Sequence, residues 1–130
     1  MINANYSPFI TLSPSGGVPT AINEAMRVTV GTIAGLPSLI AADNTVRGLG
    51  VAQQDMGVNT ASGASIALYT FAPGTRRGIL TAGPVTYGNT LYAAAAGAVA
   101  PTGTVVCGVS LTTSANVSDI VEYLAASAIT

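Results

Sequence analysis

The stretch LYAAAAGAVAPTGTVVCGVSL, residues 91–111, decides the fold of this 130-residue chain. Its four consecutive alanines favour a helix by intrinsic propensity, whereas the Val-rich run beyond a Pro and Gly turn favours a β-hairpin. A helix needs about 12 residues to form without strong packing. Gly97 and Pro101 end such a helix on one side, and Gly88 and the β-branched Thr90 limit it on the other. The alanines are therefore predicted to end a strand and to form a hairpin bend.

Apolar and polar residues alternate with period two from Arg27 onward. Gly, Pro, Asn and Asp separate the alternating runs at intervals of about 8–12 residues, which is typical of a sandwich or barrel. No window keeps the apolar stripe of a helix over three turns. We expect an all-β fold, a small β-barrel or β-sandwich of about eight short strands with an extended N-terminal arm and less than about one-tenth helix.

Residues 1–27 have a different texture, with prolines at positions 8, 14 and 19 and little alternation. Proline disfavours helix at its own and the preceding residue, so we expect an extended arm here and a β-barrel or β-sandwich domain over residues 28–130. The arm is apolar but too interrupted to fold alone, and we expect it to be ordered only against another chain. Its segment SPFITL (7–12) is suited to adding a short strand to the edge of a partner's sheet. The predicted partner-binding residues of the arm are Tyr6, Phe9, Ile10 and Leu12.

One face of the alternating strands is expected to form the core, in a register that a shift of one residue would invert. The predicted core residues are Val28, Val30, Ile33, Leu39, Val46, Leu49, Val51, Ile66, Leu68, Leu80, Val85, Leu91, Val105, Val109, Ile120 and Leu124.

Residues 35–51 and 87–109 share an order of features: a turn, Leu-x-Ala-Ala, a spacer and a Val-rich strand ending in Gly-Val. A second alternating strand follows each segment, SIALY (65–69) and DIVEY (119–123). The pattern fits a two-fold internal repeat, and it also fits chance in a chain so rich in Ala, Gly and Val.

Charged residues make up only 7% of the chain, as four arginines and five carboxylates, against about 25% in an ordinary soluble domain. A charge-poor exterior indicates that much of the surface is buried against other subunits. The arginines are scattered along the sequence and do not form the basic patch that is typical of nucleic-acid binding. No apolar run reaches the length of a membrane helix, and the N-terminus lacks the features of a signal peptide.

The chain contains no histidine and a single cysteine, which removes the usual general base and any thiolate or imidazole metal cluster. Cys107 is predicted to be a small buried residue. Asp119 and Glu122 are close in sequence, but three residues along a strand place them on opposite faces. We therefore expect no catalytic, metal or cofactor site. Arg76 and Arg77 form the one cluster of charge, either a solvated loop tip or a bidentate clamp for carboxylates of a partner protein.

Residues 78–124 carry a recognisable succession of strands and turns. A strand leads into Thr-Ala-Gly-Pro (81–84), an Asn-Thr-Leu-Tyr strand (89–92) precedes a turn of small residues, and a strand ends at Gly108-Val109 before Asp-Ile-Val-Glu (119–122). This segment resembles the C-terminal half of the head decoration or cement (capsid-stabilising) proteins of tailed bacteriophages. Residues 46–74 fit the same pattern more loosely. The near absence of charge departs from many members of that family.

This resemblance implies a structural virion protein that binds the outer surface of a phage capsid, decorates it and stabilises the shell. It implies the major capsid protein as partner, a homotrimer, assembly from protein made in the host cytoplasm, and no nucleic acid or membrane contact. Two alternatives remain open: another virion subunit (a fibre, a spike or a major shell component), or a small ligand- or glycan-binding β-module, which should present aromatic residues on one face.

Overall fold

The computed structural model describes residues 9–61, 64, 66–71 and 74–125, and within them the chain is all-β. Ten strands form two antiparallel five-stranded sheets, and one short 3₁₀ turn is the only helical element of the described residues. This arrangement confirms the predicted all-β class and the small barrel or sandwich architecture. Among these residues no helix is long and apolar enough to cross a membrane.

The first sheet belongs to residues 9–71, here called the N-half, and has the strand order β1-β5-β4-β2-β3. Its strands are β1 (Phe9–Leu12), β2 (Arg27–Ile33), β3 (Leu36–Ala41), β4 (Gly50–Ala52) and β5 (Ile66–Thr70).

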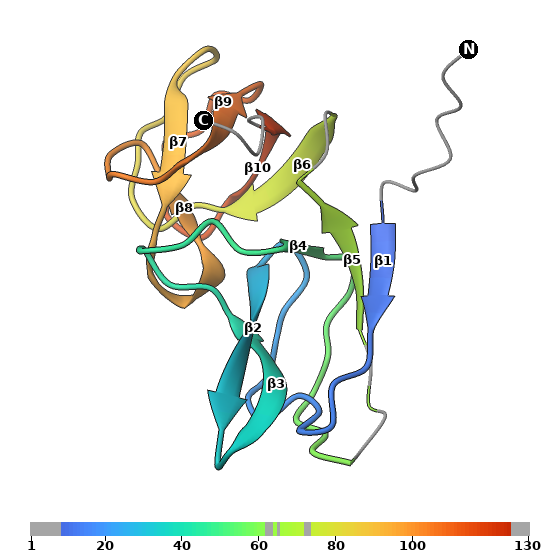
Figure 1. Cartoon of the computed structure of the whole chain (residues 1–130). Coiled ribbons are helices and arrows are strands. Elements are labelled where there is room, and N and C mark those ends of the chain that lie inside the picture. Colours follow the sequence, from blue (N-terminus) through green and yellow to red (C-terminus); the bar gives the residue numbers. More distant parts are fainter. Residues whose placement is uncertain (1–8, 62–63, 65, 72–73, 126–130) are drawn as a thin grey trace, which may run out of the picture.

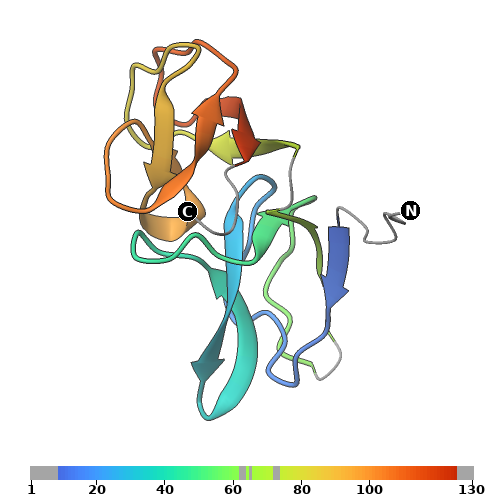
Figure 2. The same ribbon diagram turned by 45° about the horizontal axis from the view of Figure 1, so that its top comes forward.

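The second sheet belongs to residues 74–125, here called the C-half, and has the strand order β6-β10-β9-β7-β8. Its elements are β6 (Thr75–Ile79), β7 (Thr90–Ala93), η1 (Ala95–Gly97), β8 (Val99–Ala100), β9 (Val106–Ser110) and β10 (Ile120–Ala125). The two halves are stacked end to end, with the C-half above the N-half in both views (Figures 1 and 2).

The two sheets have the same topology. Strands β1 to β5 of the first sheet correspond in order to β6 to β10 of the second, and corresponding strands have corresponding neighbours. The ladders agree in detail. Gly50 and Gly108 occupy equivalent positions, and a Cβ at either would collide with a backbone carbonyl of the next strand, that of Tyr69 or Leu124. The loops agree as well, since Val18 and Asn59 exchange two backbone hydrogen bonds, as Val85 and Ser114 do. The chain is therefore a structural tandem repeat.

The repeat differs from its sequence-based alignment in one place. The Leu-x-Ala-Ala match pairs residues 39–42 with 91–94, which places β3 against β7. The topology instead makes β7 equivalent to β2 and β8 equivalent to β3, while β4 and β5 correspond to β9 and β10 as expected. Local sequence similarity misled here because many short strands of this chain share the same small residues.

The alanine-rich stretch folds as the β interpretation predicts. Ala93 ends β7, η1 forms the bend, and β8 returns antiparallel with Tyr92 opposite Ala100. Ala96 and Gly97 in the bend both have positive φ, 54° and 76°. Two successive residues of this kind are typical of tight hairpin connections.

The expectation that residues 1–27 are ordered only against another chain is wrong for the described part, residues 9–27. Strand β1 pairs with β5 of the same chain, so the segment predicted to add to a partner's sheet occupies an edge of its own sheet. Val18 and Ile22 are fully buried in the N-half core cluster. Core residues thus lie on both sides of the boundary predicted at residue 27.

Half of the predicted core is buried and nearly half is exposed. The buried predictions are Val28, Leu39, Val51, Ile66, Leu68, Leu80, Val85 and Leu91. Val105 is half-buried. The predictions that proved exposed are Val30, Ile33, Val46, Leu49, Val109, Ile120 and Leu124.

These errors have physical causes. In β10 the register is shifted by one residue, so Val121 and Tyr123 face inward in place of Ile120 and Leu124. Only Arg27 and Val28 of β2 pair with β4, so the outer part of β2 has no neighbour on that side and Val30 and Ile33 stay exposed. On the other edge of the hairpin, β3 is bound by Gly16 and Gly17, and Ser38 and Leu39 are buried. Cys107 is fully buried as expected, and burial raises the pKa of its thiol.

A buried arginine joins the two halves. Arg27, the first residue of β2, is completely inaccessible to solvent. Its Nε donates to the carbonyl oxygen of Ala98 at 2.9 Å and its Nη2 donates to that of Ala94, both beside the η1 bend of the C-half. The remaining donors bind carbonyl oxygens of the β3–β4 loop. These acceptors are Ala42, Asp43, Val46 and Arg47. Burial lowers the pKa of Arg27, but a guanidinium remains protonated in proteins.

A matched pair of leucines tests the register of the C-half. Leu91→Ala should lower the free energy of unfolding by about 2–5 kcal/mol because Leu91 is fully buried. Leu124→Ala should change it by less than about 1 kcal/mol because the side chain is 48% exposed. Denaturant unfolding measures both, and equal losses would contradict this register.

Arg27→Met should lower the free energy of unfolding by roughly 3 kcal/mol, because it leaves several buried carbonyl oxygens without donors. Arg27→Lys should fall between wild type and Arg27→Met, since one ammonium cannot reach all three segments that the planar guanidinium joins. Chemical denaturation measures both variants. A neutral effect of Arg27→Met would show that the arginine does not stabilise the junction.

Candidate partner-binding site

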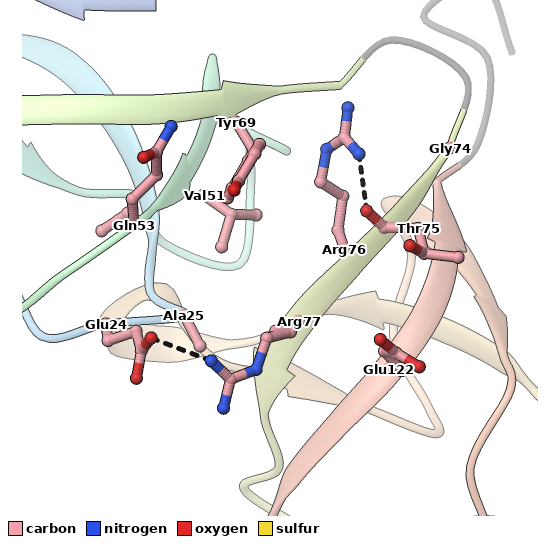
Figure 3. A pocket seen from close by; sticks show the side chains of 11 residues that line it. Glu24, Ala25, Val51, Gln53, Tyr69, Gly74, Thr75, Arg76, Arg77 and Glu122 are labelled. Carbon is pink, nitrogen blue, oxygen red and sulfur yellow. Dashed lines mark hydrogen bonds and ion pairs between the residues drawn. The ribbon is translucent and has the colours of Figure 1, made fainter. Parts of the chain in front are cut away.

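A cavity of about 440 Å³ lies where the two halves meet (Figure 3). Its walls come from the turn before β2, from β4 and β5, from the start of β6 and from β10. The lining residues are Glu24, Ala25, Val51, Ala52, Gln53, Tyr69, Gly74, Thr75, Arg76, Arg77 and Glu122.

Charge is concentrated at this cavity. The chain has four arginines and five carboxylates, nine charged residues in all, and four of the nine line these walls: Glu24, Arg76, Arg77 and Glu122. The set is balanced, with two cations and two anions. In a chain with so little charge elsewhere, this is the place with the most specific polar features for a partner.

Arg76 forms part of the inner wall and is 6% exposed. Its Nε donates to the carbonyl oxygen of Thr70 at 2.7 Å and its Nη1 donates to that of Thr75 at 2.5 Å. The guanidinium lies 5.6 Å from the centre of the Tyr69 ring, within the range of a cation–π contact. Burial lowers the pKa of Arg76 below its ordinary value. This arginine therefore holds β5 and β6 together at the cavity.

Arg77 points to the opposite face of β6 and is exposed. Its Nη1 lies 2.8 Å from Oε2 of Glu24, so the ion pair links the C-half to the turn before β2 (Figure 3). Glu122 is directly opposite Arg77 in the β6–β10 ladder. The backbone N–H of Glu24 donates to Oδ1 of Asp55 at 2.8 Å, which fixes the turn that carries Glu24.

The structure places the predicted site residues on two strands that are equivalent in the repeat. Phe9, Ile10 and Leu12 lie in β1, and Arg76 and Arg77 lie in β6. Ile10 is 38% exposed, whereas Leu12 packs against the N-half core cluster. Tyr6 lies outside the described residues.

The location of the two arginines corrects one alternative, since both lie in a strand and not at a loop tip. The carboxylate clamp stays a prediction, and it now concerns Arg77, because Arg76 is tied to carbonyl oxygens of its own chain.

Several residues of the cavity are not predicted as site residues from the sequence. Glu24, Gln53 and Tyr69 come from three distant segments, and only the fold brings them together. Arg27 is also missed there, although an arginine directly before the alternating run VTV offered a signal. A charge at the first position of a strand, in a chain with four cations, is a candidate for a buried structural contact.

The cavity offers hydrogen-bond donors, carboxylates and one aromatic face, which suit a polypeptide segment of mixed polarity. Within the described ranges, no group of three or more possible metal-binding side chains lies close together.

Comparison of the sequence with protein-family profiles gives no match, and comparison with curated protein sequences gives none either. The fold is similar to the crystal structure of the N base of head fiber gp8.5 in bacteriophage phi29. The TM-score is 0.67, and the match covers 91% of this chain and 94% of that chain at 12% sequence identity. At this identity the similarity shows a shared fold.

Neighbouring arginines in β6 should differ in their effect on stability. Arg76→Met should lower the free energy of unfolding by about 1–3 kcal/mol, because the carbonyl oxygens of Thr70 and Thr75 lose a buried charged donor. Arg77→Met should cost less than about 1 kcal/mol, because its ion pair with Glu24 is exposed and solvent-screened. Thermal and urea unfolding of the two variants measure the difference, and the reverse order would contradict this assignment.

Proposed function

We propose that this chain is a structural virion protein of a tailed bacteriophage that binds the outer surface of the capsid, decorates it and stabilises the shell. Its partners are then the major capsid protein and further copies of itself in a homotrimer, assembled from protein made in the host cytoplasm. The proposal assigns the chain no catalytic step, cofactor, nucleic acid or membrane.

The observation that carries the proposal is the fold. The N base of the phage phi29 head fiber matches this structure over nearly the whole length of both chains. The sequence resemblance of residues 78–124 to head decoration proteins points independently to the same class of protein.

The physical character of the surface supports this role. Charged residues are 7% of the chain, and large apolar side chains are exposed on both halves, among them Leu36, Val58, Val117 and Leu124. Subunits of a shell bury exposed apolar side chains against their neighbours, and exposed apolar patches are typical of interaction sites.

The base of a head fibre is a second candidate, favoured by the same structural match. A decoration protein and a fibre base both bind the shell from outside, but a decoration protein is present in many more copies. A glycan-binding module is less well supported, since Tyr123 is fully buried and Tyr92 is half-buried. Among the described tyrosines this leaves Tyr69 and Tyr87 exposed.

The proposal predicts that the protein co-purifies with intact particles of the phage that encodes it, and that antibodies against it label the head surface in electron micrographs. Quantitative mass spectrometry of density-purified particles gives its ratio to the major capsid protein. A ratio comparable with that of the shell subunits supports decoration, and a much lower ratio supports a fibre base. Absence from purified particles, or label on the tail alone, would refute the proposal.

A further inference from the structure

In the contact between the two halves, the hairpin turn between β7 and β8 packs against the N-half. Gly97, in the bend between β7 and β8, donates its N–H to the carbonyl oxygen of Ala42 at 2.7 Å. A Cβ at Gly97 would lie 3.0 Å from the carbonyl oxygen of Arg27 and 3.0 Å from Cβ of Met26. The carbonyl oxygens of the flanking residues Ala94 and Ala98 accept hydrogen bonds from the Arg27 guanidinium. The C-half turn therefore docks on the N-half face that carries Arg27.

The N-half has the equivalent turn, and none of the described residues covers it. Ala34 and Gly35 join β2 to β3 with φ of 53° and 81°, nearly the values of Ala96 and Gly97. Both turns have the sequence Ala-Gly. No atom of the described residues lies within 4 Å of a Cβ built on Gly35. The turn is flanked by Ile33 and Leu36, 46% and 48% exposed, at the far end of the hairpin from the C-half (Figure 1).

The C-half has the equivalent face, and in the part of the chain that the structure describes Val109 and Leu124 are exposed on it. The β2–β4 and β7–β9 ladders make Thr90 equivalent to Arg27 and Val109 equivalent to Val51. Arg27 and Val51 are buried by the C-half, with Val51 packed in the cluster of C-half core residues. Val109 is 40% exposed, and Leu124 opposite it is 48% exposed.

We propose that the β2–β3 turn of one copy docks on the C-half face of a second copy that carries Thr90 of β7, Val109 of β9 and Leu124 of β10. This would repeat between molecules the contact that joins the two halves within each molecule, because these positions are equivalent to Arg27, Val51 and Tyr69. We take a second copy as the occupant because it carries a turn, Ala34-Gly35, of the same sequence and backbone conformation as the turn that docks within the chain. Counted over the described residues, each chain has one uncovered turn and one uncovered face, so the proposed contact is head to tail. Such heterologous contacts close into a ring or continue as a filament.

The side chains match this assignment. Inside the chain, small alanines flank the turn and an arginine binds their carbonyl oxygens. Between copies, Ile33 and Leu36 flank the turn, and the face presents Thr90 in place of Arg27, with the apolar Val109 and Leu124 beside it. Glu122 lies on the same exposed side of β10, two residues before Leu124. Beyond Arg27, the hairpin contains no charged residue, since residues 28–42 are all uncharged. The predicted contact is therefore apolar, and a charge introduced on either surface should weaken it.

This inference deepens the self-association included in the proposed function and rests on it for its setting. Its test uses only the isolated protein. Attachment to phage heads can thus fail while head-to-tail association is found, and the reverse outcome is equally distinguishable.

The first experiment measures self-association by analytical ultracentrifugation over a range of concentrations. Wild type should associate. The hairpin variant Ile33→Lys/Leu36→Lys and the face variant Val109→Glu/Leu124→Glu should each weaken association more than tenfold. An equimolar mixture of the two variants should recover it, because the introduced charges are opposite across the contact.

The matched control is Val58→Lys/Val117→Lys, two exposed valines, 63% and 58%, that lie outside both surfaces. It should associate like wild type, and circular dichroism should show that all variants are folded. A monomeric wild type, or variants that associate as well as the control, would overturn the proposal. A monomer whose hairpin variant no longer binds particles would assign this turn to the capsid protein instead.

A crosslinking experiment tests the direction of the contact. Leu36→Cys and Val109→Cys, carried on chains of different tag size, should form a disulfide-linked heterodimer on mild oxidation only when mixed. The native Cys107 is fully buried and should not react. Disulfide dimers of Leu36→Cys alone, with no heterodimer in the mixture, would show a symmetric contact and overturn the head-to-tail arrangement.

Discussion

The junction between the halves is built around one buried cation, Arg27, whose hydrogen bonds within the described residues go to backbone carbonyl oxygens. A buried charge is costly unless its donors are satisfied, and the Arg27 guanidinium meets this requirement with carbonyl oxygens from the β3–β4 loop and from both sides of the η1 bend. The planar group thereby fixes two irregular segments that no sheet ladder holds. Together with the Gly97–Ala42 hydrogen bond and the apolar cluster around Val51, this contact sets the relative position of the halves and the charged cavity between β5, β6 and β10.

The repeat is symmetric in topology and asymmetric in burial. Equivalent strands keep the same neighbours in both sheets, but only the N-half has its outer face covered by the other half's turn. A tandem pair of identical folds necessarily leaves one turn and one face unmatched. In this chain those surfaces are apolar at Ile33, Leu36, Val109 and Leu124. An assembly subunit needs surfaces of this kind, whereas a monomeric protein would be exposed to aggregation by them.

The candidate site shows how far sequence reasoning reaches. The pair Arg76-Arg77 stands out in a chain with four cations, and it lies at the cavity. Its chemistry could not be read from the sequence, because adjacent residues of a strand point to opposite faces. One arginine therefore binds buried carbonyl oxygens, and the other forms an exposed pair with Glu24. Apart from Thr75, the remaining polar residues of the cavity come from other segments of the chain: Glu24, Gln53, Tyr69 and Glu122.

The sequence by itself determined the all-β class, the hairpin at residues 91–100 and about half of the core. These depend on alternation and on glycine and proline turns, which act over a few residues. The tertiary structure alone decided that residues 9–12 complete their own sheet and that β10 turns Val121 and Tyr123 inward. It also decided that Arg27 is buried. Each of these outcomes depends on which strand edge or carbonyl oxygen meets the residue across the fold, and a shift of one residue along a strand exchanges its inner and outer faces.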